Sequence, residues 1–534
     1  MYSPMTRTRS LVAGGALSPP SHFNFVTDVL WPRARAIPDA TAIIGVGRNG
    51  EVERWTYERV TQAVGNLAAA LVERGIGQGD RILLLMPRTP LWQLVMSACL
   101  YIGAIPVPCV TQSSPGEVRY RALTVGARGA ITSAEFVERF AEFQDSLGVR
   151  LARHGAPGWE TLESLIDLNR SAPPAATLSA DTPALIYFTS GSSGMPKAVV
   201  HAARGVHARA WQPWYQLGTG PNDVIWSTSD TGWTRAGSCL LFGPWMYGAA
   251  ALIVDGSLTP GRKLDLIAQH RVSIFGAVAT ELRQIMSEAV ARPLPSLRWT
   301  LSAGEAMTAE LSDAWRAFSG TPLVVGYGQT ETPTSTLTDP QAEAVNGMIG
   351  APMAGNAVTV LDKHGQPALP GALGEIAFAG SHPGLMLGYW REGRIVAEFG
   401  RDGWHMTGDT GYLDADGCLF FIGRSDDIIS SSGYRIGPTE VENALSRHPA
   451  VQECAVAASP DAERGEVVKA FVVLQDGCSG SSELVRALQD FVKQEIAPFK
   501  YPRRIEFVAE LPRTSSGKIS RRLLREAEFA GVSA

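Results

Sequence analysis

The sequence predicts an α/β protein with a large N-terminal domain built on parallel sheets and a small α+β domain at the C-terminus. The chain has 534 residues, enough for more than one domain. Between about residues 24 and 325, apolar strand-like runs alternate with helical segments. Such alternation is typical of parallel sheets covered by helices. After residue 427 a shorter mixed pattern of helices and strands predicts the second domain.

The elements of the first domain follow from hydrophobic periodicity. Two uncharged stretches, 89–116 and 236–254, could be membrane spans, but glycines and prolines interrupt both. We interpret each as a buried helix followed by a buried strand. Strands are predicted at 81–86, 184–188, 223–227, 250–254, 272–275 and 323–325, and helices at 57–74, 261–270 and 281–291.

Beyond residue 355 the pattern changes twice. Many glycines and short strands between 355 and 423 predict a β-rich subdomain. We therefore place the N-terminal domain at 1–423, a hinge at 424–427 and a mobile C-terminal domain at 428–534, because a small domain on a short polar linker can move. In the last domain we expect helices at 440–447 and 482–496 and strands at 451–457, 467–474 and 504–508.

Composition excludes several classes of protein. Apolar residues make up 45% of the chain and the net charge is −5, so there is no basic field that would indicate nucleic-acid binding. The six cysteines are scattered and none forms a C-x-x-C pair, which argues against a disulfide framework and a cysteine zinc site. The scattered cysteines predict a cytoplasmic protein. The apolar stretch at 11–17 is too short for a signal peptide, so we expect a disordered tail at the N-terminus.

One loop indicates phosphate binding. It follows an apolar run and ends at Lys197, and its glycines and hydroxyls let backbone N–H groups surround phosphate oxygens. The spacing is neither that of a Walker A loop nor that of a nucleophile elbow. Taken alone, the segment is equally typical of a surface turn. It comprises Thr189, Ser190, Gly191, Ser192, Ser193 and Gly194.

Further motifs follow in a fixed order, at 302–306, 326–332, 407–409, 423–427, 432–435 and 512–518. Together with the T-S-G-S-S-G-M-P-K loop at 189–197, they resemble the adenylate-forming superfamily of acyl-CoA synthetases, adenylation domains and luciferases. The resemblance covers nearly the whole chain after the N-terminal tail and is greatest to medium-chain acyl-CoA synthetases and aromatic-acid CoA ligases. It implies that the protein uses ATP to activate a carboxylic acid as an acyl-adenylate, releasing pyrophosphate, and then transfers the acyl group to coenzyme A, releasing AMP.

The resemblance assigns the nucleotide site, with ATP/AMP and Mg²⁺ as ligands. Tyr327 would stack on adenine, Thr330 would contact the α-phosphate and Glu331 would hold Mg²⁺, a cation that prefers oxygen ligands. Asp409 would bind the ribose hydroxyls and Arg424 the ribose or phosphate. A helix N-terminus at 330–331 and an Asx turn at residue 409 are the structural alternatives. The remaining nucleotide-binding residues are the phosphate loop with Lys197, then Gly304, Glu305, Ala306, Gly326, Gly328 and Gln329.

By the same resemblance, the C-terminal domain serves both half-reactions. Lys518 would bridge the carboxylate and the α-phosphate, although a solvated basic tail is the alternative because three arginines follow it within seven residues. Asp426 would be the hinge residue. Gly433, together with Tyr434 and Arg435, would receive the pantetheine arm of coenzyme A, since glycine allows a close approach.

The acyl pocket is assigned to Trp233, Gly276, Ala277, Val278, Gly304 and Gly328. The relatives commonly have G-A-P-[ST] where this chain has Gly276-Ala277-Val278-Ala279, so the floor of the pocket differs. We expect a medium-chain fatty acid as substrate, with a benzoate-like or other aryl acid as the alternative. Two further hypotheses are a stand-alone adenylation enzyme that loads a carrier protein and a non-catalytic nucleotide-binding protein. A small-molecule acid and coenzyme A are the expected partners, and a homodimer stays open.

Overall fold

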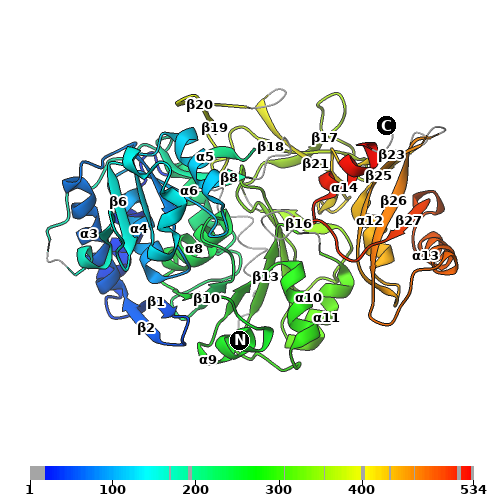
Figure 1. The fold of residues 1–534 in the computed structure, drawn as a ribbon, viewed down its shortest axis with the longest axis horizontal. Helices are drawn as coiled ribbons and strands as arrows, with labels where there is room; N and C mark the ends of the chain where they lie inside the picture. The colour runs from blue at the N-terminus through cyan, green and yellow to red at the C-terminus, as the bar shows by residue number, and fades with distance from the viewer. Residues whose placement is uncertain are drawn as a thin grey trace.

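The structure is a computed structural model that describes residues 18–167, 170–189, 195–305, 307–353, 355–398, 403–431, 434–461, 464–513 and 519–530. A large N-terminal part and a smaller C-terminal part lie side by side (Figure 1). Each part has its own hydrophobic core. The predicted α/β class is confirmed, with parallel sheets in the first part and an α+β arrangement in the second.

One sheet of the N-terminal part is entirely parallel. Its order is β4 (Ile105–Pro108), β3 (Arg81–Leu85), β5 (Gly129–Ser133), β6 (Val149–Arg153) and β7 (Glu160–Thr161). Every residue of α4 (Pro90–Tyr101) is buried, and α4 packs against α3 (Tyr57–Glu73). The stretch 89–116 is therefore a buried helix and strand, as predicted. No helix in the described ranges has the length and apolarity needed to cross a membrane.

A thirteen-stranded sheet forms the centre of the N-terminal part. Its parallel half contains β1 (Thr41–Val46), β11 (Ala250–Val254), β10 (Val224–Ser227), β12 (Ile274–Gly276), β13 (Trp299–Ala303) and β14 (Leu323–Tyr327), with β2 (Val52–Thr56) antiparallel at the edge. The crossover helices are α9 (Pro260–Gln269), α10 (Ala279–Glu288) and α11 (Ala309–Ser319). Consequently the carboxyl ends of β12, β13 and β14 lie along one edge, where ligands bind in open α/β sheets.

The β-rich region does not form a sheet of its own. Its strands are β15 (Thr336–Leu337), β16 (Met348–Pro352), β17 (Val358–Leu361), β18 (Gly374–Ala379), β21 (Trp404–Leu413) and β22 (Leu419–Arg424). Because β15 pairs with both β14 and β16, the hydrogen-bond ladder continues from the parallel half into these antiparallel strands. The residues at the ends of β14 and β21 thus share one sheet.

A four-stranded sheet carries the predicted phosphate loop. It consists of β8 (Pro183–Thr189), β9 (Lys197–Ala202), β19 (Gly388–Arg391) and β20 (Arg394–Val396). Strands β8 and β9 form a hairpin in which Thr189 pairs with Lys197. The other helical segments of this part are η1 (Val26–Leu30), α2 (Trp31–Ala36), α5 (Pro115–Val125), η2 (Ala134–Phe140), η3 (Gln144–Ser146), η4 (Glu163–Leu165), α6 (Ala203–Trp211), α7 (Thr234–Gly237), η5 (Ser238–Phe242) and α8 (Gly243–Met246).

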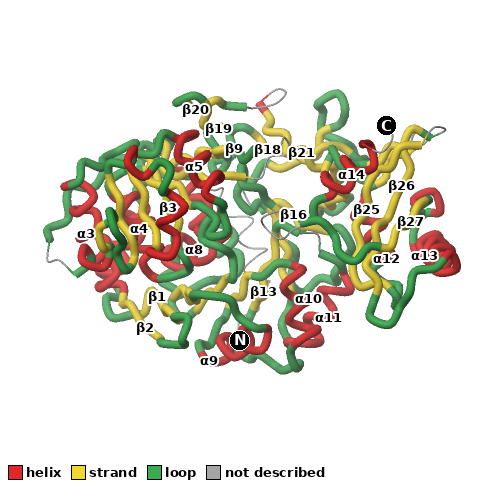
Figure 2. The backbone as a smooth tube through the Cα atoms, viewed as in Figure 1, coloured by secondary structure: helices red, strands yellow, loops and turns green. Residues whose placement is uncertain are grey.

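The C-terminal part has a five-stranded sheet with helices beside it (Figure 2). Its strands are β23 (Ile429–Ser431), β24 (Tyr434–Ile436), β25 (Val451–Asp461), β26 (Gly465–Leu474) and β27 (Arg504–Phe507), and its helices are α12 (Pro438–Leu445), α13 (Ser482–Glu495), η7 (Pro498–Lys500) and α14 (Arg521–Ala530). A turn at 425–427 separates β22, in the large sheet, from β23, in the small one. The predicted hinge lies at this change of sheet, and its motion stays a prediction.

Candidate functional site

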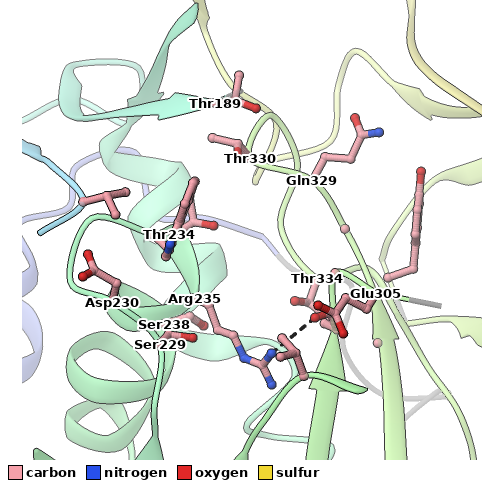
Figure 3. A pocket seen from close by; sticks show the side chains of 18 of the residues that line it. Thr189, Ser229, Asp230, Thr234, Arg235, Ser238, Glu305, Gln329, Thr330 and Thr334 are labelled. Atoms are coloured by element: carbon pink, nitrogen blue, oxygen red, sulfur yellow. Dashed lines mark hydrogen bonds between the residues drawn. The ribbon is translucent and has the colours of Figure 1, made fainter. Parts of the chain in front are cut away.

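A cavity of about 1800 Å³ lies along the carboxyl ends of the central strands and extends to the C-terminal part. Its walls come from the ends of β8 and β9, the loop after β14, strands β21 and β22, and the segment 519–525. Figure 3 shows Thr189 and Thr330 near each other on one side of the cavity, with Asp230 and Arg235 below them. Segments far apart in the chain therefore face one space.

The predicted phosphate loop reaches the cavity through its two ends. Thr189 and Lys197 both line it, and Lys197 Nζ lies 5.1 Å from the centre of the Tyr389 ring. The residues between them, Ser190, Gly191, Ser192, Ser193 and Gly194, lie outside the described residues. The hairpin register thus places one hydroxyl and one cation at the cavity.

The loop 328–333 is held by a buried arginine. Arg209, on α6, donates from Nη2 to the Thr330 carbonyl at 3.0 Å and from Nη1 to the Thr332 carbonyl at 3.4 Å. Burial lowers the pKa of Arg209 to about 10, so the guanidinium is still charged at neutral pH. No helix begins within this loop, and the helix-cap alternative for Thr330 and Glu331 is therefore wrong. Sequence reasoning missed Arg209, which is buried in α6 among small and apolar residues.

Glu331 lies beside two polar side chains, those of Tyr389 and His405. The Tyr389 hydroxyl donates to Glu331 Oε1 at 3.0 Å. Burial and this carboxylate raise the pKa of Tyr389, so the phenol keeps its proton and acts as a donor. His405 also lines the cavity, and burial lowers its pKa although the Glu331 charge opposes that shift. Neither Tyr389 nor His405 was found from the sequence.

The Glu331 carboxylate fits a magnesium site that is completed by substrate phosphates and water. Within the described ranges, no three acidic, cysteine or histidine side chains are grouped as a metal site. Magnesium is commonly held by one or two carboxylates together with substrate phosphates and water. A single carboxylate beside Thr330 and Lys197 at the cavity matches that donor set.

Asp409 is the centre of the predicted nucleotide site. The residue is buried, with 3% of its surface exposed. Its carboxylate accepts hydrogen bonds from Tyr327 Oη at 2.6 Å, Gln329 Nε2 at 2.7 Å and Arg424 Nη1 at 2.8 Å. Burial and the Asp409 charge raise the pKa of Tyr327 well above its usual value, so the phenol remains a donor. Residues from three separate motifs, at 326–332, 407–409 and 423–427, therefore meet at this carboxylate.

The glycines of this region allow close backbone packing. A Cβ on Gly328 would lie 2.3 Å from the Pro333 carbonyl oxygen, and one on Gly326 would lie 2.8 Å from Thr334 Cγ2. Gly304 has a φ of +86°, which favours glycine. The neighbouring Glu305 accepts from the Thr280 backbone N–H at 2.9 Å, so it is tied to the first turn of α10. Ala306 lies outside the described residues.

The predicted acyl pocket adjoins this region. Trp233, Ala277 and Val278 line the cavity, as do Gly304 and Gly328. Gly276 instead lies behind the wall, where a Cβ would be 3.5 Å from Arg235 Nη2.

An unpredicted arginine belongs to this pocket. Arg235 donates to the carbonyls of Leu301 at 2.6 Å, Ala277 at 3.0 Å and Ala303 at 3.2 Å, and it also lines the cavity. It follows the S-D-T-G-W segment by two residues, which is the signal that could have found it.

Asp230 has a structural partner. Its carboxylate accepts from the Thr111 hydroxyl, from the Thr111 N–H at 3.2 Å and from the Gly232 N–H at 2.9 Å. The carboxylate therefore joins two loops, which agrees with its not being the ligand of a substrate ammonium group.

The C-terminal part contributes one edge of the cavity. Arg513 and Ile519 form a β-bridge with each other and both line the cavity, while Lys518 lies outside the described residues. Arg521 donates to Glu442 Oε1 at 2.8 Å, so this first arginine after Lys518 is not part of a solvated tail. Asp426 lines the cavity too, and its carbonyl accepts from Arg525.

The predicted coenzyme A segment has a different position. Tyr434 is 53% exposed and stacks on Phe499, with ring centres 4.4 Å apart, and it is not among the residues that line the cavity. Arg435 lies in β24, where it pairs with Ser430. Gly433 lies outside the described residues.

Known proteins match the chain over most of its length. A family model described as AMP-binding enzyme matches residues 30–390, and one described as AMP-binding enzyme C-terminal domain matches residues 440–518. The human protein "Acyl-coenzyme A synthetase ACSM3, mitochondrial" is 35% identical over 537 aligned residues, which cover 96% of this chain and 91% of the human one.

Solved structures share the fold. The anthranilate CoA ligase AuaEII, in complex with anthranoyl-AMP, has a TM-score of 0.87 and 27% identity, covering 97% of this chain and 100% of its own. A benzoate CoA ligase from Burkholderia xenovorans LB400 has a TM-score of 0.82 and 28% identity, covering 94% and 100% of the two chains.

Proposed function

This chain belongs to the AMP-binding enzyme family and is an AMP-forming acid–CoA ligase, and from this premise we propose that its substrate is a medium-chain or aryl carboxylic acid. One observation carries the proposal. The Asp409 cluster, the loop with Thr330 and Glu331, and the pocket walled by Trp233 all face the same cavity. A nucleotide and an acid bound there can react directly.

The nucleotide would be positioned by the Asp409 cluster. A carboxylate can accept hydrogen bonds from both ribose hydroxyls, as the acidic residue of dinucleotide sites does. Three donors hold Asp409 in one orientation before the nucleotide arrives. Tyr327 would stack on adenine beside it, and its protonated hydroxyl keeps the ring in place.

The phosphates would lie between the hairpin of β8 and β9 and the loop after β14. Lys197 supplies a positive charge there, and Thr330 supplies a hydroxyl. Glu331 would hold Mg²⁺, which when bound neutralises charge on the phosphate oxygens. The Tyr389 hydroxyl orients this carboxylate.

In the first half-reaction, a carboxylate oxygen of the acid attacks the α-phosphorus of ATP and pyrophosphate leaves. Two anions must approach each other, so the site needs positive charge at the developing transition state. We assign that charge to Lys518, whose flanking residues Arg513 and Ile519 line the cavity.

The second half-reaction needs a path for the thiol of coenzyme A. In the present arrangement Arg513 and Ile519 line the cavity, whereas Tyr434 stacks on Phe499 and is not among the lining residues. The arrangement therefore suits adenylation. Rotation about the turn at 425–427 would bring Gly433 to the cavity and remove Lys518 from it, as the coenzyme A thiolate attacks the acyl carbon and AMP leaves.

The pocket and the similar proteins support two classes of acid as substrate. A medium-chain fatty acid remains our first assignment, and an aryl acid is favoured by the names of two similar solved structures, which are ligases of anthranilate and benzoate. Val278 stands where the family that the sequence resembles commonly has proline, so the floor of the acyl pocket would differ for either class of acid. The scattered cysteines support a cytoplasmic location.

Pyrophosphate release from MgATP tests the proposal. The purified enzyme would be assayed with fatty acids of different lengths and with aryl acids, with and without coenzyme A, and the thioester would be identified by mass. We expect AMP and an acyl-CoA product with at least one acid of these two classes. Failure to form AMP with every acid would refute the function, and transfer only to a phosphopantetheinyl carrier protein would favour the carrier-loading alternative.

A further inference from the structure

The acyl pocket contains a fixed cation. Arg235 lies on the short helix α7, two residues after Trp233, and its guanidinium extends to the carboxyl ends of β12 and β13 (Figure 3). Three backbone carbonyls accept from its Nη1 and Nη2 atoms at 2.6 to 3.2 Å. The Gly276 backbone lies beside this position, since a Cβ there would be in ordinary van der Waals contact with Nη2, at 3.5 Å. The side chain is therefore held in one position before any acid binds.

The positive charge of Arg235 has no ionic partner in the described part of the chain. The three oxygen acceptors of its hydrogen bonds are all neutral backbone carbonyls. The Cys239 thiol lies within hydrogen-bonding reach of Arg235, and burial raises its pKa, so it remains neutral and supplies no negative charge. Removing a charged group from water costs free energy unless the group is paired. A saturated hydrocarbon chain bound beside the guanidinium would exclude water from it and offer no acceptor, so such a chain would bind poorly there.

The surroundings of Arg235 are also polar. The Ser227 hydroxyl lies 3.2 Å from that of Ser229, and a Cβ on Gly276 would contact the Ser227 side chain at 3.2 Å. Ser229 and Ser238 line the same cavity. A guanidinium has five N–H donors; the three carbonyl bonds use three of them and the Cys239 thiol lies within reach of a fourth, so at least one is left for a further acceptor.

We propose that Arg235 selects acids that carry a second oxygen acceptor, a carboxylate, carbonyl or hydroxyl group, at the end of the acyl group remote from the reacting carboxyl. This inference rests on the proposed ligase function and specifies its substrate class. The guanidinium binds that acceptor, and the reacting carboxyl group remains at the nucleotide. Arg235 is thus a specificity residue of the acyl pocket and takes no part in the chemical steps.

Pairs of acids of similar size, within one non-hydrogen atom of each other, test the proposal on the unchanged enzyme. Adipate would be compared with heptanoate, and terephthalate, 4-acetylbenzoate and 4-hydroxybenzoate with 4-ethylbenzoate, by kcat/KM for pyrophosphate release. We expect the acid with the second acceptor to be preferred by roughly 10-fold or more in at least one series, since a site that bonds a polar group rejects an analogue lacking it. The dicarboxylates and the neutral acids distinguish a charged acceptor from an uncharged one. Equal or better turnover of the apolar acid in both series overturns the inference, whereas absence of AMP with all acids refutes the ligase function itself.

Variants of Arg235 give a second test. Arg235→Met should reduce the preference by roughly 10- to 100-fold while turnover of the apolar acid is retained or rises, and Arg235→Lys should keep part of the preference. Arg298→Met is a control for the loss of carbonyl hydrogen bonds away from the cavity: Arg298 donates to the carbonyls of Leu217 and Gly218, and also pairs with the Asp223 carboxylate at 2.7 Å, but does not line the cavity. An equal loss with every acid in Arg235→Met would mean that the arginine only supports the strands or holds the reacting carboxylate, and would overturn the inference. If that variant fails to fold, the preference measured in Arg235→Lys and in the unchanged enzyme decides.

Discussion

Replacement of Asp409 by asparagine tests the nucleotide site most directly. The substitution preserves shape but removes the negative charge and replaces one acceptor oxygen by an NH₂ group. Tyr327 and Gln329 both donate to Oδ2, and Arg424 donates to Oδ1. Whichever way the amide is turned, at least one of these donors then faces another donor.

The expected magnitude follows from the bonds that the nucleotide would make. A hydrogen bond to an ionised group contributes about 1.5 to 3 kcal/mol, so losing the ionised acceptor for two ribose hydroxyls weakens ATP binding by roughly 3 kcal/mol. This corresponds to about 100-fold in KM for ATP. Arg424 has an exposed fraction of 41% in its side chain and can be resolvated, which limits the loss of folding stability to roughly 1–2 kcal/mol.

The assay is pyrophosphate release at varied ATP and saturating acid, together with calorimetric titration of AMP. Asp416→Asn provides a matched control, because Asp416 is exposed at the tip of the same β21–β22 hairpin and does not line the cavity. We expect the control to behave like the unchanged enzyme. If Asp409→Asn keeps its KM for ATP and its AMP affinity within a factor of two, the assignment of Asp409 to the ribose is refuted.

Five other substitutions have defined outcomes. Arg209→Met should lower kcat/KM for ATP by roughly 10-fold and also the melting temperature, since the loop after β14 loses its buried donors; unchanged kinetics would contradict that role. Tyr389→Phe should raise the Mg²⁺ concentration for half-maximal activity a few-fold, measured by titration, because the neighbouring carboxylate loses a donor. Lys518→Ala should abolish adenylation but spare thiolysis of a supplied acyl-adenylate, and Gly433→Leu should do the reverse; loss of both half-reactions in either variant would refute the two-state scheme. Burial lowers the pKa of His382 to about 4, so between pH 6.5 and 4 the unfolded chain binds more protons than the folded one. The free energy of unfolding should therefore fall by about 3 kcal/mol as the pH falls through this range. Denaturant titrations should show a weaker pH dependence for His382→Gln, and an equally strong one would contradict this source of acid sensitivity.

Local patterns were sufficient for most elements of the fold. The apolar run at 250–254 is strand β11 with the same bounds, and the helical period at 57–74 is α3 (Tyr57–Glu73). These patterns work because burial on one face imposes a period that reads directly from the residues. The union of the β-rich strands with the central sheet was not predicted, since it depends on the pairing of β15 with β14 and β16, and pairing partners leave no local pattern.

Motifs likewise identified residues but not their partners. Tyr327 and Asp409 were assigned to one nucleotide from separate motifs, whereas the hydrogen bond between them, across 82 residues of sequence, appears only in the folded chain. Arg209 and Arg235 had no motif, and their importance comes from burial beside the loop after β14 and from projection into the acyl pocket.

The order of the motifs and their resemblance to a known family were thus enough to predict the class of chemistry, because a phosphate loop and an acidic ribose ligand need particular residues at particular positions. The shape and charge of the acyl pocket were decided by tertiary structure. Strand register and helix packing bring distant side chains to one wall, and no short stretch of sequence encodes which charges will meet there.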